Sequence, residues 1–248
     1  MSDTPEPAAD PARVRRLDDA TIASVAAGEV ITRPADVVVE LTENALDAGA
    51  SRIEVDVAGD GTDRIRVRDD GSGMDREDAA LAVERHTTSK LGSDGALSTV
   101  ETLGFRGEAL GSIATVATLE LVTNDGGREG TRVVADAPDA KRVDPAGRAR
   151  GTTVTVRDLF AETPARRQSL GTPQTEFARV SDVVSRYALV RPDVAFELSH
   201  DGSAVFSTAG TGAFDDALLG VYDRQIASRT VRVDGQTTVA ADTDASPA

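Results

Sequence analysis

The sequence predicts an α/β fold in which amphipathic helices pack against a sheet. Residues 52–58 (RIEVDVA) and 64–69 (RIRVRD) alternate apolar and polar side chains, as half-buried strands do, and a Gly-Asp-Gly turn joins them. Residues 34–49 and 174–190 instead repeat apolar side chains every three or four positions, as a helix with one buried face does. The chain has 248 residues, which is long enough to bury a substantial core.

The first half of the chain begins with a polar tail and continues with helices and strands. Residues 1–12 are rich in proline, alanine and acidic side chains and are expected to be disordered. A helix ending near Gly28 precedes the helix that Pro34 starts. After the two strands we expect a short helix near 75–83. The glycine- and serine-containing segment 84–105 follows, and its length is typical of a functional loop or lid.

The second half of the chain continues to alternate helices with strands. The expected elements are a helix over 107–113, strands over 116–123, 130–136 and 152–157 with a turn-rich stretch at 137–150 between the last two, the helix over 174–190, strands near 194–199 and 203–206, a helix near 214–222 and a strand pair near 229–240. The composition loosens after Gly210. We therefore divide the chain into the tail 1–12, a main domain 13–210, and a piece 211–248 that is too small for its own core.

The composition excludes several classes of protein. There are no cysteines, so disulfides and thiolate metal sites are excluded, and two histidines leave little room for an imidazole metal site. The N-terminus lacks the basic start and apolar run of a signal peptide, and no segment approaches the roughly 20 apolar residues of a membrane span. We expect a soluble, cytoplasmic protein without a membrane partner.

The charge of the chain is strongly negative. The formal net charge is −15, and only Lys90 and Lys141 among the 27 basic residues are lysines. Such a charge argues against broad electrostatic attraction to nucleic acid. Many acids with few lysines and few aromatics suit a cytosol of very high salt, where the Debye length falls to about 3 Å at 1 M. We interpret the composition as halophilic, and the alternative is an ordinary acidic surface.

The helix predicted over 34–49 carries the first candidate site residues. Glu40 and Asn44 stand four positions apart and share one face. The amide oxygen of Asn44 suits Mg²⁺, which prefers oxygen ligands, and the carboxylate of Glu40 suits a general base toward an attacking water. The alternative is a solvated polar helix face.

A second group of candidate residues follows the strand 64–69. Asp69 has the same parity as Ile65 and Val67, so its carboxylate points toward the core and needs a donor partner. The exocyclic amine of adenine is such a donor, and Gly71 and Gly73 let the backbone turn sharply and approach a ring closely. The alternative is an ordinary Asp-Gly turn at the end of a strand.

A third group is rich in glycine and precedes a predicted helix. Gly104 and Gly107 lie where free backbone N–H groups at a helix start would bind an anion. Lys90, a rare lysine within Thr-Thr-Ser-Lys, favours a specific phosphate contact. The alternative is a glycine-rich hinge without a ligand. Walker and dinucleotide-binding glycine motifs are absent, so the three groups together indicate ATP binding without a P-loop.

Taken together, these motifs resemble the N-terminal ATPase domain of the MutL family of DNA mismatch repair proteins, a branch of the GHKL ATPases. The resemblance runs in collinear order over roughly residues 14–206. The matching segments are Ala26–Val30, Arg33–Ala35, Glu40–Ala50, Asp69–Gly73, Arg85–Lys90, Gly104–Leu110, Gly151–Thr153, Asp158–Phe160 and Thr163–Arg167. The chain departs from the common pattern at Val39, Asp70, Ala161, Glu162 and Gln168.

The resemblance implies a fold and a set of site residues. The fold would be a two-layer α/β sandwich of the Bergerat (GHKL) type, a mixed, mostly antiparallel sheet with helices on one face, over 13–210. Residues 211–248 would begin a second, transducer domain. The implied roles are Glu40 as general base, Asn44 as Mg²⁺ ligand, Asp69 as adenine contact with Gly71, Gly73 and Thr152 beside the base, and Lys90 with the lid Gly104, Phe105, Arg106, Gly107 and Glu108 around the phosphates.

The resemblance also implies a function in DNA mismatch repair. ATP would order the lid and bring two N-terminal domains together, coupling a mismatch-recognition protein of MutS type to a downstream nuclease or helicase, with weak, non-specific DNA contact. Hydrolysis would be slow, and reduced or absent if a transducer-domain lysine is required. The alternatives are the ATPase subunit of another GHKL class, such as a type II topoisomerase, or a truncated interaction protein that does not hydrolyse ATP.

Overall fold

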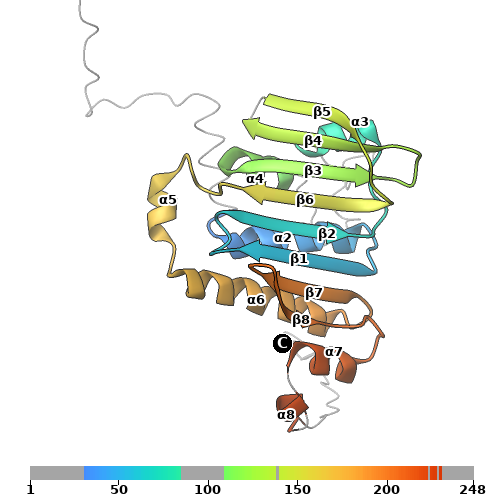
Figure 1. Ribbon diagram of the computed structural model, residues 1–248, viewed down its shortest axis with the longest axis vertical. Helices are drawn as coiled ribbons and strands as arrows, with labels where there is room; N and C mark the ends of the chain where they lie inside the picture. The colour runs from blue at the N-terminus through green and yellow to red at the C-terminus, as the bar shows by residue number, and fades with distance from the viewer. Residues whose placement is uncertain (1–30, 85–108, 138–139, 223, 228, 231–248) are drawn as a thin grey trace, which may run out of the picture.

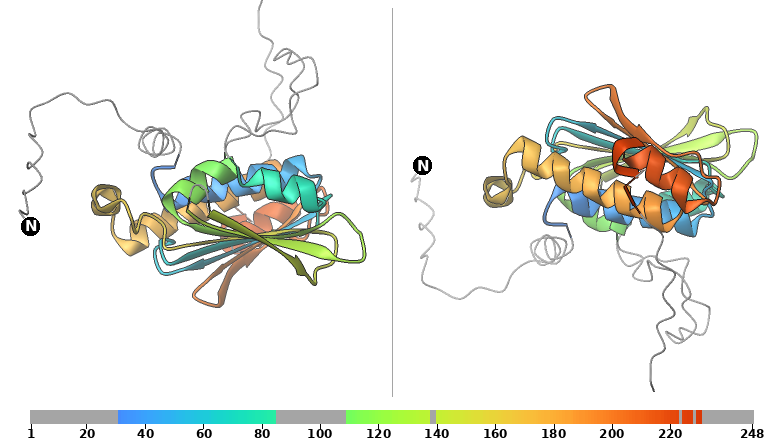
Figure 2. Two further views of the ribbon diagram at one scale, coloured as in Figure 1. Left: turned by 90° about the horizontal axis from the view of Figure 1, so that it is seen from above. Right: turned by 90° about the horizontal axis from the view of Figure 1, so that it is seen from below.

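One mixed sheet of eight strands forms a layer of the molecule, and the main helices cover one face of it (Figures 1 and 2). The structure is a computed structural model and describes residues 31–84, 109–137, 140–222, 224–227 and 229–230. Its elements are α2 (Pro34–Asp47), β1 (Arg52–Ala58), β2 (Arg64–Asp69), α3 (Arg76–Ala82), α4 (Ala109–Val116), β3 (Thr118–Asn124), β4 (Gly130–Ala137), β5 (Ala140–Ala146), β6 (Gly151–Arg157), α5 (Pro164–Ser169), α6 (Pro173–Val190), β7 (Ala195–His200), β8 (Ser203–Ser207), α7 (Phe214–Val221) and α8 (Arg224–Ala227).

The strand order is β5-β4-β3-β6-β2-β1-β7-β8, and all neighbouring pairs are antiparallel except β1 and β7. Parallel neighbours need a long crossover connection, usually a helix. The strands that flank α6 in sequence, β6 and β7, lie on either side of the β1–β2 hairpin, and α6 packs along α2 beneath it. The expected mixed, mostly antiparallel sheet with helices on one face is therefore confirmed.

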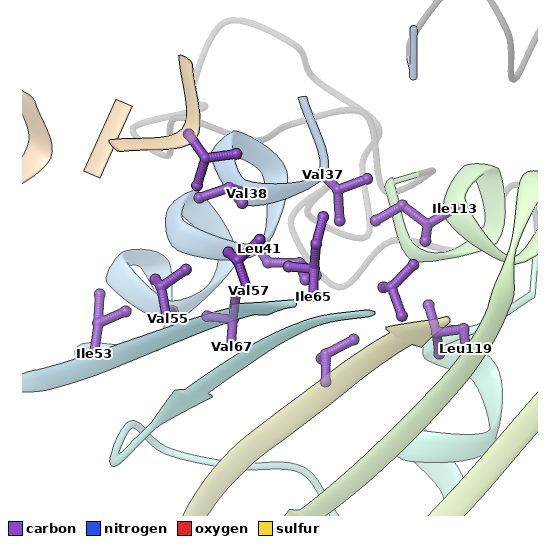
Figure 3. Packing of buried hydrophobic residues seen from close by; sticks show 14 of the residues in the cluster. Val37, Val38, Leu41, Ile53, Val55, Val57, Ile65, Val67, Ile113 and Leu119 are labelled. Carbon is purple, nitrogen blue, oxygen red and sulfur yellow. The ribbon is translucent and has the colours of Figure 1, made fainter. Parts of the chain in front are cut away.

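The core lies between the sheet and the helices. Side chains of alternate residues in β1 and β2 point to the same face and meet the buried face of α2, with α4 and β3 closing the cluster at one side (Figure 3). The labelled members are Val37, Val38, Leu41, Ile53, Val55, Val57, Ile65, Val67, Ile113 and Leu119, all at most 3% exposed.

Local signals fix both ends of α2. Pro34 occupies the first turn, and the carboxylate of Asp36 accepts hydrogen bonds from the backbone N–H groups of Thr32 and Arg33 at 2.8 and 3.0 Å. Beyond the helix, Gly49 adopts a φ of +69°, which favours glycine, and donates its N–H to the carbonyl of Leu46.

A buried carboxylate joins the beginning of α6 to its surroundings. Glu176 is fully buried, and its Oε1 accepts hydrogen bonds from the N–H of Gly171 and from Arg179 at 2.8 and 2.5 Å. Arg33, which precedes α2, lies 4.0 Å from the same oxygen. The first turns of the two longest helices are thus linked through one acidic side chain.

The structure confirms most of the expected elements and corrects one. The strands 52–58 and 64–69 have the predicted bounds, and the helix predicted over 174–190 is α6. The turn-rich interpretation of 137–150 is wrong, because residues 140–146 form β5. Pro145 lies within this strand, and a strand at the edge of the sheet can accommodate a missing N–H donor.

Some predictions lie outside the described residues. These are the tail 1–12, the helix ending near Gly28, the segment 84–105 apart from residue 84, and nearly all of the strand pair near 229–240. Among the helices that the structure does describe, none combines the length and the apolarity that crossing a membrane requires.

Candidate functional site

Asp69 lies at the end of β2, where its position places the carboxylate on the core side of the sheet. The residue is 9% exposed, as its parity with Ile65 and Val67 predicts. Oδ1 accepts hydrogen bonds from the N–H groups of Gly71 and Thr152, at 2.9 and 3.2 Å. Both hydrogen bonds found for this carboxylate within the described residues end on Oδ1, so Oδ2 is left for a donor from a ligand.

The environment of Asp69 opposes its ionisation. Burial raises the pKa of this carboxyl above its ordinary value, while the N–H groups of Gly71 and Thr152 and the positive charge of Arg148 act to lower it. The neighbouring charge of Asp70 adds to the rise. A buried carboxylate with one oxygen fixed by two backbone donors is suited to accept a further hydrogen bond in a defined direction.

The two predicted glycines allow close packing of the loop that follows β2. A Cβ at Gly71 would lie 2.8 Å from the Cβ of Ala48 at the end of α2. Gly73 has a φ of +68°, and a Cβ there would lie 1.9 Å from the carbonyl oxygen of Asn124. The loop therefore packs between the end of α2 and the end of β3, and glycine is required because protein backbone approaches it closely.

A pair of hydroxyl groups connects β3, β6 and the loop after β2 beside Asp69. Thr152 is the second residue of β6, is 8% exposed and places its Oγ1 3.0 Å from Oγ1 of Thr123 on β3. The Thr123 hydroxyl also lies 3.2 Å from the carbonyl of Gly151 and accepts the N–H of Met74 at 3.0 Å. The predicted residue Thr152 is thus brought next to Asp69, while Thr123 was not predicted.

Helix α2 presents the second part of the candidate site. Glu40 and Asn44 are half-buried and follow each other along the same face. Glu43 stands beside them and accepts a hydrogen bond from the hydroxyl of Tyr187 on α6, at 2.8 Å. Burial, the contact with Glu43 and the charge of Glu40 raise the pKa of Tyr187 above its ordinary value, so the phenol remains a donor.

This helix face fits a hard cation. Mg²⁺ takes oxygen ligands, keeps several waters and often needs only one or two protein ligands. Asn44 supplies an amide oxygen, and Glu40 and Asp47 supply carboxylates four before it and three after it on the same helix. Within the described residues no cluster of three histidine, aspartate or glutamate side chains forms a metal cage. The donor set therefore suits a cation that takes one or two ligands from the protein and the others from water and from a bound small molecule.

Asp70 departs from the common family pattern and has a structural role. Its carboxylate accepts hydrogen bonds from the N–H groups of Ser51 and Arg52 at 2.8 and 2.9 Å, and from the Ser51 hydroxyl at 2.6 Å. Burial acts to raise the pKa of Asp70, but these hydrogen bonds outweigh it and lower the value. Asp70 thus anchors the start of β1 to the loop after β2.

The predicted phosphate side of the site lies outside the described residues. It consists of Lys90 and the lid residues Gly104, Phe105, Arg106, Gly107 and Glu108, whose roles stay predictions. The helix that was expected to follow the lid begins at Ala109 in the described chain and extends to Val116, three residues beyond its predicted end.

Comparison with known proteins first defines the class of ATPase to which the chain is similar. Residues 31–142 match the family described as histidine kinase-, DNA gyrase B-, and HSP90-like ATPase, which is the GHKL class. The fold agrees with the solved Aquifex aeolicus MutL ATPase domain complexed with ADP: the sequence identity is 31%, the TM-score is 0.63, and the match covers 77% of this chain and 69% of that chain. The two-layer Bergerat fold with its mixed sheet is thereby confirmed.

The relatives then define the family. MutL of Halobacterium salinarum is 55% identical over 226 residues, covering 90% of this chain and 34% of the relative, and MutL of Symbiobacterium thermophilum is 47% identical over 224 residues, covering 90% and 35%. The chain belongs to the MutL family of DNA mismatch repair proteins. It spans about a third of the length of these curated relatives. The Halobacterium relative also fits the halophilic interpretation of the composition.

Proposed function

We propose that this chain binds ATP with Mg²⁺ and hydrolyses it slowly, as the nucleotide-driven switch of a DNA mismatch repair clamp. The observation that carries the proposal is Asp69, a buried carboxylate with Oδ1 fixed by Gly71 and Thr152 and with Oδ2 available. The exocyclic amine of adenine is the donor that such an acceptor fits. The ADP complex of the Aquifex aeolicus relative supports a nucleotide as the ligand.

Each predicted residue has a chemical task in this proposal. Glu40 accepts a proton from the attacking water, as a general base near the phosphates would. Asn44 would hold Mg²⁺ through its amide oxygen, and a metal bound there would supply positive charge to offset that of the phosphates. Lys90 and the lid 104–108 hold the phosphates. Because lid contacts with the nucleotide form only in the closed state, ATP shifts the population toward closure.

The wider role is proposed from the family. The proposed domain bounds are 13–210 for the ATPase domain and 211–248 for the start of the transducer domain. Closure would bring two copies together and pass the signal from a MutS-type protein to a downstream nuclease or helicase in the cytoplasm. DNA contact would be weak, since the net charge is −15. The named relatives are MutL proteins, which favours this role over a topoisomerase subunit.

The proposal is tested by calorimetry of Mg-ATP binding in molar KCl. We compare the unmodified chain with Asp69→Asn, and we use Asp70→Asn as the matched control because Asp70 contacts only the start of β1 among its described hydrogen bonds. We expect binding that Asp69→Asn abolishes and Asp70→Asn retains. Failure of the folded, unmodified chain to bind would overturn the ATPase assignment. Binding without turnover would instead support the non-hydrolysing alternative.

A further inference from the structure

Arg148 joins the two strands that form the candidate base-binding site. It lies in the loop between β5 and β6, and its Nη2 donates to the backbone carbonyl of Asp69 at 2.6 Å. Its Nε donates to the carbonyl of Gly151 at 3.0 Å, immediately before Thr152. The carbonyl of Arg148 itself accepts a hydrogen bond from Asn124 at 2.8 Å. One guanidinium therefore fixes the end of β2 relative to the start of β6.

The same guanidinium also acts on the Asp69 carboxylate through its charge. Arg148 is half-buried, and burial lowers its pKa, an effect that the charge of Arg68 reinforces and those of Asp69 and Glu54 oppose. The positive charge in turn favours the ionised form of Asp69, while Asp70 disfavours it. A partly buried charge is screened less by salt than an exposed one, so this effect persists at high ionic strength.

We propose that Arg148 is a positioning residue for base specificity, which aims the Asp69 carboxylate so that Oδ2 accepts from a 6-aminopurine and discriminates against a 6-oxopurine. This inference rests on the proposed ATP site. An ionised carboxylate only accepts hydrogen bonds, which suits the 6-amino group of adenine, whereas a protonated carboxyl has an O–H donor, which suits a 6-oxo group. Arg148 favours the ionised carboxylate of Asp69 and fixes the backbone of the same residue.

The mechanism differs from simple support of the fold. Loss of a structural brace would weaken binding of every nucleotide to a similar degree. Loss of Arg148 should instead weaken binding of the 6-amino base and leave or improve binding of the 6-oxo base, because the protonated carboxyl becomes more populated. A site that selects a substrate by matched hydrogen-bond donors and acceptors loses selectivity when one of its acceptors becomes a donor.

The test is calorimetry of Mg-ATP and Mg-ITP in molar KCl for the unmodified chain and for Arg148→Gln. Arg142→Gln is the matched control, because Arg142 forms an exposed ion pair with Asp144 on the edge strand β5. We expect Arg148→Gln to lower the ATP-to-ITP affinity ratio by about tenfold, the order of one hydrogen bond to a charged group. Arg142→Gln should leave the ratio unchanged.

Arg148→Lys provides a second variant if Arg148→Gln does not fold. Lysine keeps the positive charge but cannot reproduce the fixed fork that reaches two carbonyls, so ATP affinity should fall while the preference for ATP over ITP is largely kept. An ATP-to-ITP ratio that Arg148→Gln leaves unchanged, in a chain that binds ATP, overturns this inference alone. An unmodified, folded chain that binds neither nucleotide overturns the proposed function together with it.

Discussion

Gly73 lies where the loop after β2 crosses the end of β3, with a φ of +68° that L side chains rarely adopt. A Cβ at this position would lie 1.9 Å from the carbonyl oxygen of Asn124, a distance that no relaxed structure allows. Gly49 has nearly the same φ, +69°, but apart from its own and its neighbouring residues no heavy atom of the described chain lies within 4 Å of the position of its Cβ. The two residues therefore separate the cost of backbone conformation from the cost of steric exclusion.

We expect Gly73→Ala to lower the free energy of unfolding far more than Gly49→Ala does. The left-handed conformation costs about 1–2 kcal/mol for a residue with a Cβ, and both variants incur this cost. Gly73→Ala must also displace the loop from Asn124, so its total loss should exceed about 3 kcal/mol, in the range of severe substitutions. Denaturant unfolding in molar KCl measures both values. Equal losses would mean that the loop is not held against β3.

At the scale of elements, the sequence predicted those parts that local periodicity determines. The strands 52–58 and 64–69 alternate cleanly, and α6 repeats its apolar residues over many turns. Strand β5 was missed because Pro145 and its charged residues are typical of a turn, and only pairing with β4 makes the segment a strand. The parallel pairing of β1 with β7 joins segments distant in sequence, so no local pattern could indicate it.

The candidate site divides in the same way. The inward direction of Asp69 follows from strand parity, and the pairing of Glu40 with Asn44 follows from helical spacing. Thr123 and Arg148 were not predicted, because their contacts cross from one strand or loop to another. Arg148 meets Asp69 across 79 positions of sequence, in a stretch interpreted only as turn-rich. Arginine in a loop is usually a solvated charge, so its sequence context carried no signal.

The contact between α2 and α6 supports a prediction at this scale. Tyr187→Phe keeps the ring that packs against the core but removes the hydroxyl that donates to Glu43. We expect the free energy of unfolding to fall by about 1 kcal/mol, which is below the usual range for hydrogen bonds to charged groups because both partners are half-exposed. Chemical denaturation of Tyr187→Phe, Glu43→Ala and the double variant measures the coupling. A coupling below about 0.3 kcal/mol would show that this bond does not hold the helices together.

At the scale of the whole molecule, two electrostatic effects oppose each other. The sheet carries cross-strand ion pairs, including Arg52 with Glu197 at 2.8 Å and Arg132 with Glu120 at 2.6 Å. Such partly exposed pairs contribute about 0–1 kcal/mol each, and salt weakens them. The net charge of −15 destabilises the compact chain by self-repulsion, and salt weakens this too. Self-repulsion acts on the whole chain, so we expect it to dominate the response to salt.

We therefore predict that the thermal unfolding midpoint of this chain rises as KCl increases from dilute buffer to 1 M and beyond. Screening is nearly complete once the Debye length reaches about 3 Å at 1 M, so it explains only the first part of the rise. A further rise in multimolar KCl would reflect exclusion of salt from the protein surface, which strengthens burial. Differential scanning calorimetry over a KCl series measures both parts, and sucrose at matched osmolality serves as the uncharged control. A midpoint that is independent of KCl would contradict the halophilic interpretation, because a chain of this charge would then be stable without screening.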